Sequence, residues 1–115
     1  MNTNITQYID KPDILKQTAE QIIKDFEMFG IEIKFSGNDS NAYQEIFNQI
    51  EPHISKLIEN NRQKLMVVIN RIDINEQQIK KAKAENPNKD FSVVLSDLII
   101  KRELQKVVIR NHYKK

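Results

Sequence analysis

Glycine and proline are scarce in this chain, and their scarcity limits the folds that it can adopt. Its 115 residues include two Gly and three Pro, whereas a β-sandwich or barrel turns back on itself about every ten residues and relies on such residues to do so. A β-rich fold is therefore disfavoured. With 39% hydrophobic and 30% charged residues, the chain has the composition of one globular domain. We expect a single helical domain over residues 1–115, with a flexible N-terminus (about 1–9) and a basic C-terminal tail (about 111–115).

Apolar residues recur at three- and four-residue steps through most of the chain, which is helical spacing. The pattern predicts helices over about 12–29, from 42, from about 52 to 72, from 75 to about 84 and over about 91–111. Asp10 is the predicted N-cap of the first helix and Gly30 its left-handed C-terminal residue. Capping boxes are predicted at Asn41 and Asn75. Pro52 interrupts the pattern, so the long helix that starts there is either separate from the preceding one or joined to it by a kink.

One short segment, Ile31–Phe35, alternates apolar and polar residues, as a half-buried strand does. A lone strand must pair with another strand, run as an extended segment over the helices, or pair with its copy in a second chain. We expect a mainly α fold, an antiparallel bundle of four to five helices with this one extended segment. The alternative is an α+β fold, in which Leu65–Ile74 is a strand that pairs with Ile31–Phe35.

The last predicted helix is apolar around almost its whole circumference. Such a helix is buried by several neighbours, and here it is either the centre of the bundle or a surface that a second subunit covers. Together with the lone extended segment, it suggests a homodimer or another protein partner. The candidate interface residues are Ile31, Ile33, Phe35, Ile100, Leu104 and Val107.

The net charge of +2 hides a polarised chain. Residues 1–60 carry five Lys against ten acids, whereas residues 61–115 carry thirteen Lys and Arg against six acids. Several cations recur at helical spacing near the C-terminus and form a candidate anion-binding or nucleic-acid-binding face: Lys101, Arg102, Lys106, Arg110 and Lys114. A phosphate backbone could follow such a face. Alternatively, the cations complement the helix dipole or the acidic first half.

Several chemistries lack the residues that they require. The chain has no Cys, and neither His53 nor His112 stands in a metal-binding motif. It has no Gly-rich phosphate loop and no Ser nucleophile on a sharp turn. We therefore expect no metal, no cofactor and no catalytic residues. Charged residues near the last two helices, namely Arg71, Asp73, Asp97, Arg102 and Glu103, are predicted to form a structural ion-pair network.

The N-terminal residues lack the basic and apolar regions of a signal peptide, and the longest apolar run, Leu65–Ile69, is too short to cross a bilayer. We therefore expect a cytoplasmic protein. The abundance of Ile, Asn and Lys suggests an AT-rich, bacterial genome. The resulting hypothesis is a small non-enzymatic helical interaction or scaffold protein that self-associates. The alternatives are a nucleic-acid-associated protein that uses the basic face and a ligand-binding or enzymatic bundle with carboxylates in a cleft.

Overall fold

The described part of the chain is a mainly α bundle of five α-helices, as the sequence predicts. A computed structural model describes residues 11–113, and the expected N-cap Asp10, the expected flexible N-terminus and the last two residues of the basic tail lie outside them. The helices are α1 (Pro12–Glu27), α2 (Ala42–Asn60), α3 (Arg62–Ile72), α4 (Glu76–Glu85) and α5 (Phe91–Tyr113), with a short 3₁₀ helix, η2 (Asp39–Asn41), before α2. No strand occurs within residues 11–113, so the two-stranded alternative is wrong.

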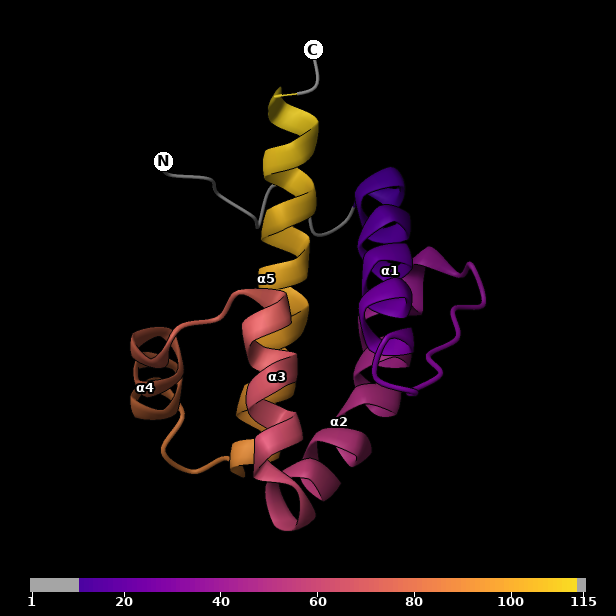
Figure 1. Cartoon of the computed structure of the whole chain (residues 1–115). Helices are drawn as coiled ribbons and strands as arrows, with labels where there is room; N and C mark the ends of the chain where they lie inside the picture. Colours follow the sequence, from indigo (N-terminus) through magenta and orange to yellow (C-terminus); the bar gives the residue numbers. More distant parts are fainter. Residues whose placement is uncertain (1–10, 114–115) are drawn as a thin grey trace.

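Helix α5 is the centre of the bundle. It packs against α1, α2, α3 and α4 (Figure 1). Its buried residues lie on several faces, which explains the nearly continuous apolar circumference. They are Val94, Leu95, Ser96, Ile99, Ile100, Glu103, Leu104, Val107 and Val108. The hypothesis of a central last helix is confirmed, because the chain's own helices cover these residues.

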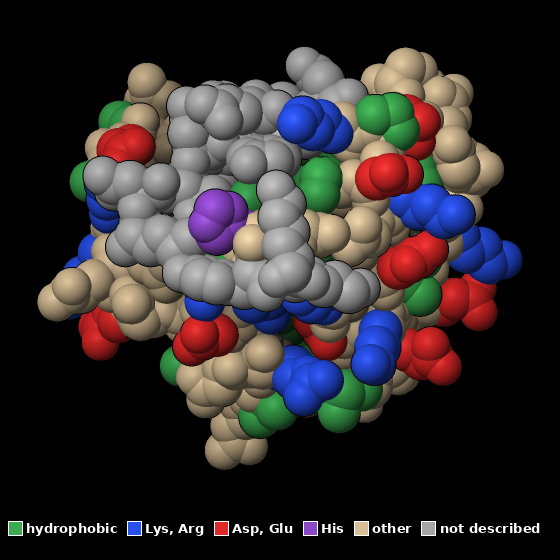
Figure 2. Space-filling model, turned by 90° about the horizontal axis from the view of Figure 1, so that it is seen from above, with side chains coloured by type: hydrophobic (Ala, Val, Ile, Leu, Met, Phe, Trp, Pro, Cys, Tyr) green, Lys and Arg blue, Asp and Glu red, His purple; other side chains and the backbone are tan. Residues whose placement is uncertain are grey.

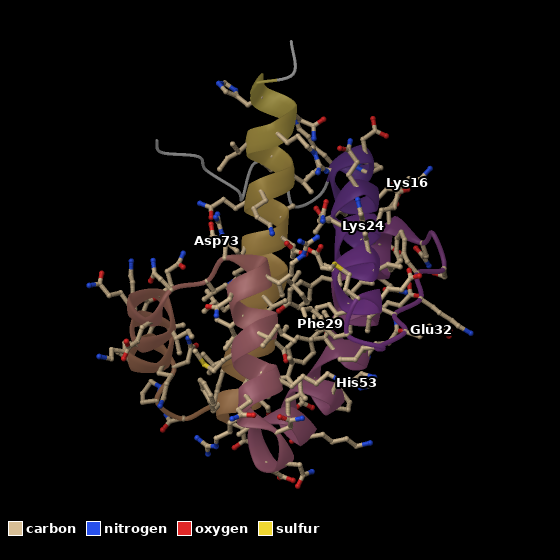
Figure 3. The ribbon with its side chains drawn as sticks, viewed as in Figure 1. Lys16, Lys24, Phe29, Glu32, His53 and Asp73 are labelled. Atoms are coloured by element: carbon tan, nitrogen blue, oxygen red, sulfur yellow. The ribbon has the colours of Figure 1, made fainter. Side chains whose placement is uncertain are left out.

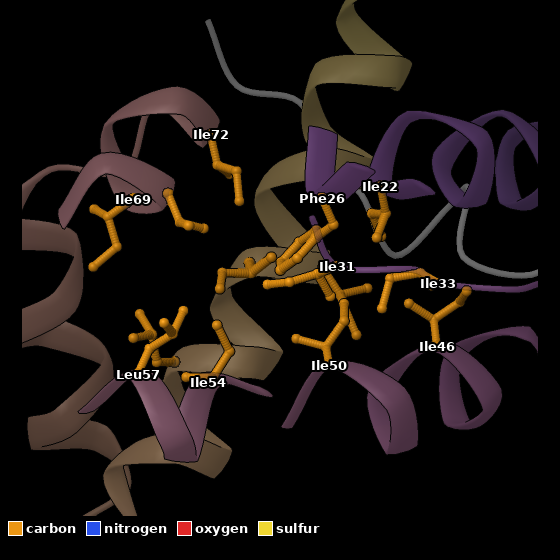
Figure 4. Close-up of a cluster of buried hydrophobic side chains, with 14 of the residues drawn as sticks. Ile22, Phe26, Ile31, Ile33, Ile46, Ile50, Ile54, Leu57, Ile69 and Ile72 are labelled. Carbon is orange, nitrogen blue, oxygen red and sulfur yellow. The ribbon is translucent and has the colours of Figure 1, made fainter. Parts of the chain in front are cut away.

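The main core lies where α1, α2, α3 and α5 converge. Phe26, Ile50, Ile54, Ile72 and Leu95 are fully buried there, and Figure 4 shows several of these side chains pointing into one space. A second, smaller cluster joins the first turn of α1 to the last turns of α5. Close packing of these branched side chains fixes the positions of the helices, since interiors have few voids.

The segment after α1 is extended but is not a strand. Gly30 has a φ of 76°, which ends α1 as predicted and turns the chain back across the bundle. Ile31 and Ile33 then point inward between α1 and α2 (Figure 4). On the outer side, the Gln49 side chain accepts a hydrogen bond from the Lys34 amide at 2.8 Å and donates one to the Lys34 carbonyl at 2.6 Å. One turn earlier on α2, Glu45 accepts hydrogen bonds from the Ser36 amide and hydroxyl. The side chains of α2 therefore replace the missing neighbouring strand.

Of the two alternatives predicted at Pro52, a separate helix that starts there is wrong, and the segments before and after the proline are joined. α2 runs through Pro52 without interruption and ends at Asn60. Its buried face continues across the proline through Ile50 and Ile54, so packing offsets the loss of one helical hydrogen bond. The break falls instead at Asn61, whose side chain accepts a hydrogen bond from the Lys64 amide at 3.1 Å and caps α3.

The two predicted capping boxes have different outcomes. At Asn75 the box is complete, because Asn75 Oδ1 accepts from the Gln78 amide and Gln78 Oε1 accepts from the Asn75 amide, both at 2.8 Å. At Asn41 the prediction is wrong, because that side chain makes no capping hydrogen bond. η2 occupies the position, and Asn38 caps it by accepting from the Ser40 amide.

Candidate functional site

Three of the four described cations of the basic face are paired with carboxylates of the same chain. The pairs are Lys101–Asp97 at 2.9 Å, Arg102–Asp73 at 2.9 Å and Lys106–Glu103 at 2.7 Å. Arg110 donates a hydrogen bond to Gln21 of α1, and Lys114 lies outside the described residues. Acidic and basic side chains are interspersed on the visible described part of the surface in Figure 2. Cations with such partners present less free charge to a phosphate backbone.

The ion pair between Arg102 and Asp73 confirms one part of the predicted network. Asp73 ends α3 in the left-handed conformation, with a φ of 68°, and stands at the upper end of that helix (Figure 3). Arg102 donates hydrogen bonds to its carboxylate at 2.9 Å and to its backbone carbonyl at 3.1 Å. The pair therefore joins the end of α3 to the middle of α5.

The predicted interface residues lie inside the chain. Ile31, Ile33, Ile100, Leu104 and Val107 are all buried. Phe35 is partly buried and packs against the main core. In the described chain these residues belong to the core, and Phe35 alone among them leaves part of its side chain accessible.

Two acidic residues are buried at the junction of α1 and α5. Asp25 is 1% exposed and Glu103 is 0% exposed. Asp25 Oδ1 accepts a hydrogen bond from Gln21 at 3.1 Å and lies 3.5 Å from Arg71 Nε of α3. Lys106 Nζ lies 2.7 Å from Glu103 Oε1, without hydrogen-bond geometry. Asp25 Oδ2 and both Glu103 oxygens have no hydrogen-bond donor among the described residues.

These surroundings change the acidity of Glu103. Burial, followed by the adjacent Asp25 carboxyl, raises the pKa of the Glu103 carboxyl, Lys106 opposes both effects, and the net result is a rise from 4.5 to about 8. A carboxyl that loses its water favours the neutral form, and a like charge beside it acts in the same direction. Both acids are closed off from the surface of the described chain.

A second polar cluster lies nearer the surface, where α2 and α5 meet. The Tyr43 hydroxyl donates a hydrogen bond to Asp97, which also pairs with Lys101. Burial, followed by the Asp97 carboxylate, raises the pKa of Tyr43 well above its ordinary value. Tyr43 therefore stays a neutral donor at physiological pH. A surface depression of about 430 Å³ adjoins this cluster, and Glu85, Lys89 and Lys101 are among the residues that line it.

Three large apolar side chains remain exposed, against the trend of the rest of the chain. Met28, which follows α1, is 61% exposed, and Met66 and Val67 on α3 are 52% and 55% exposed. Single exposed apolar residues are normal on protein surfaces. These three, however, stand on two helices that pack against each other.

Within residues 11–113, no group of three His, Cys, Asp or Glu side chains could hold a metal ion. The same part of the chain contains no helix long and apolar enough to span a bilayer. No protein-family model, curated protein or solved structure matches the chain. A function for this protein must therefore be inferred from the residues of the chain itself.

Sequence reasoning flagged Glu103 and Arg71 but missed Asp25. A helical wheel places Asp25 on the same face as Thr18 and Ile22, which lie seven and three residues before it. That spacing is the signal that could have identified it as a buried acid. The exposure of Val67 could not be predicted in this way, because Val67 belongs to a run of three β-branched residues, and such a run is equally compatible with burial.

Proposed function

We propose that the protein is a small non-enzymatic interaction module that self-associates through a surface formed by α1 and α3. We call this the α1/α3 surface and define it by Glu27, Met28, Val67 and Arg71, with Met66 beside it. The observation that carries the proposal is the exposure of Met28 and Val67, each by more than half, on neighbouring helices. Burying such side chains against a partner is favourable by about 1.5–3 kcal/mol each.

The ion pair between Asp25 and Arg71 supports the view that Met28 and Val67 belong to one surface. This pair links α1 to α3, and the two helices run in opposite directions (Figure 1). Met28 follows Asp25 by about one turn, and Val67 precedes Arg71 by about one turn. Both therefore lie on the same side of the ion pair along the bundle axis. Phe29, also near this end, lies between α1 and α3 in Figure 3.

The charges around these residues favour a second copy of the chain as the partner. The α1 side carries exposed Glu27, whereas Glu32 is paired with Lys34 at 3.3 Å and points away from α3 in Figure 3. The α3 side carries Arg62 and Arg71 and has no acidic residue. A twofold interface brings one patch against its own copy, so the acidic side of each copy meets the basic side of the other. Such a patch is self-complementary, whereas a patch of one sign would repel its copy.

The size of the surface sets the expected strength. A stable interface buries about 800 Å² per partner, which is more than these exposed apolar side chains supply on their own. We therefore expect association that depends on concentration, without an obligate dimer. This expectation fits a monomer whose core is already complete.

Light scattering coupled to size-exclusion chromatography tests the proposal. With increasing concentration, the wild-type mass should rise from 13.6 kDa toward twice that value. Val67→Lys should stay monomeric, because it places an ammonium group in the centre of the surface. Ala84→Lys, which adds the same charge at an exposed position of α4, should behave as wild type. A wild-type protein that remains at 13.6 kDa up to roughly millimolar concentration, or a Val67→Lys variant that associates equally well, would refute self-association through this surface.

A further inference from the structure

The buried carboxyls of Asp25 and Glu103 are neighbours that come from two helices far apart in the sequence but packed against each other. Asp25 belongs to the last turns of α1 and Glu103 to the middle of α5. Three of their four oxygens have no hydrogen-bond donor within the described chain. Both side chains are excluded from bulk solvent. A buried acceptor without a donor is costly.

We propose that Asp25 and Glu103 share one proton, and that this proton acts as a latch that holds α1 against α5. When Glu103 carries the proton, it becomes a donor to the facing Asp25 carboxylate. The shared proton supplies a missing hydrogen bond and removes one of two like charges from the interior. When the proton leaves, two carboxylates face each other in the core, and the contact between α1 and α5 weakens.

Two cations act on this pair, one from α3 and one from α5. Arg71 lies 3.5 Å from Asp25, but its side chain is 44% exposed, so water screens part of its attraction. Lys106 lies 2.7 Å from Glu103 and is more enclosed. Lys106 favours the ionised form of Glu103 and opposes the latch, yet burial and Asp25 outweigh it and leave the pKa at about 8. Arg71 faces Asp25 Oδ1, the oxygen that also accepts a hydrogen bond from Gln21, and leaves Oδ2 without a donor among the described residues.

The sign of the pH dependence follows from this pKa. The carboxyl titrates at 4.5 in its ordinary state and at about 8 in the folded chain, so the folded state holds one extra proton between these values. The stabilisation by this proton is complete below pH 4.5 and is lost as the pH rises through about 8. Above that range both states are ionised and no further loss comes from Glu103.

Chemical denaturation from pH 5 to 9 tests the latch. At each pH, the unfolding equilibrium constant of the wild type is divided by that of Glu103→Gln. The Gln side chain at position 103 keeps a hydrogen-bond donor at every pH. As the pH rises toward about 8, the unfolding constant of the wild type should therefore increase relative to that of the variant, by up to tenfold per pH unit. Glu20→Gln, an exposed position on α1, should run parallel to wild type. Parallel curves for wild type and Glu103→Gln would overturn the proposal.

A direct measurement keeps the test valid if Glu103→Gln does not fold. In protein labelled with ¹³C at the Glu carboxyl carbon, one resonance should titrate near pH 8. In Asp25→Asn the same resonance should titrate at lower pH, because this variant lacks the neighbouring carboxyl that raises the pKa of Glu103. Amide exchange in α1 of the wild type should also become faster above pH 8 than in a folded Glu103→Gln variant at the same pH. A spectrum in which every glutamate titrates below about pH 6, or α1 exchange that is equal in both proteins, would contradict the latch. None of these readouts depends on self-association.

Discussion

The side chain of Gln49 is predicted to hold the extended segment on the bundle, and its removal gives a sharp test. Gln49 makes two hydrogen bonds to the backbone of Lys34, at 2.8 and 2.6 Å. Each neutral hydrogen bond contributes about 0.5–1.5 kcal/mol net. Because Lys34 is exposed, water replaces part of what is lost, and we expect Gln49→Ala to lower the free energy of unfolding by about 1–2 kcal/mol. For a chain of this size the melting temperature then falls by about 4–8 °C.

A second substitution at the same position separates hydrogen bonding from packing. Gln49→Glu keeps an acceptor for the Lys34 amide but loses the donor, and it places a carboxylate beside the Lys34 carbonyl. It should therefore destabilise the fold more than Gln49→Ala does. Gln44→Ala is the matched control, because Gln44 is exposed on the same helix and bonds only to the Asn48 side chain. Urea denaturation gives the free energies, and amide exchange at Lys34 reports the local contact.

The reasoning fails if Gln49→Ala and Gln44→Ala unfold at the same urea concentration while the Lys34 amide stays protected. In that case the buried side chains of Ile31 and Ile33 alone would hold the segment. A Gln49→Glu variant as stable as wild type would lead to the same conclusion.

Two further predictions concern the helices themselves. Pro52→Ala restores a helical hydrogen bond inside α2 and should raise the free energy of unfolding by about 1–3 kcal/mol, measured by thermal denaturation. An unchanged or lower melting temperature would show that the helix accommodates the proline without cost. Asn75→Ala removes the capping box and should cost about 1 kcal/mol. Because α4 has no buried residue, that loss should appear mainly as faster amide exchange within α4, and exchange as slow as in wild type would contradict it.

Sequence patterns fixed the helical elements where local and tertiary signals agree. The capping box at Asn75 and the left-handed Gly30 are local features with a direct physical cause, so they could be read from neighbouring residues alone. The central position of α5 followed from its apolar circumference, since only burial on several faces makes that composition stable.

The errors arose where packing overrides a local preference. Pro52 disfavours a helix interior, but the buried positions on both sides of it, Ile50 and Ile54, keep α2 continuous. The extended segment looked unpaired because the partners of Lys34 and Ser36 are side chains of a helix, and no strand pattern reveals them.

The candidate site was only half predictable for the same reason. Glu103 stood out as an acid in an apolar helix, whereas Asp25 is one of several charged residues on an amphipathic helix. Their proximity depends on how α1 and α5 pack against each other. The two residues are far apart in the sequence, so no local pattern predicts it. The exposed α1/α3 surface likewise depends on which faces the bundle leaves uncovered.

Self-association through the α1/α3 surface is tested most directly by following amide chemical shifts as the protein is concentrated from roughly 20 µM to 1 mM, a range that spans weak interfaces. We expect concentration-dependent shifts around Glu27, Met28 and residues 62–71, with α4 unaffected. Shifts that stay constant over this range, or that cluster on α4 and α5 instead, would contradict the proposal.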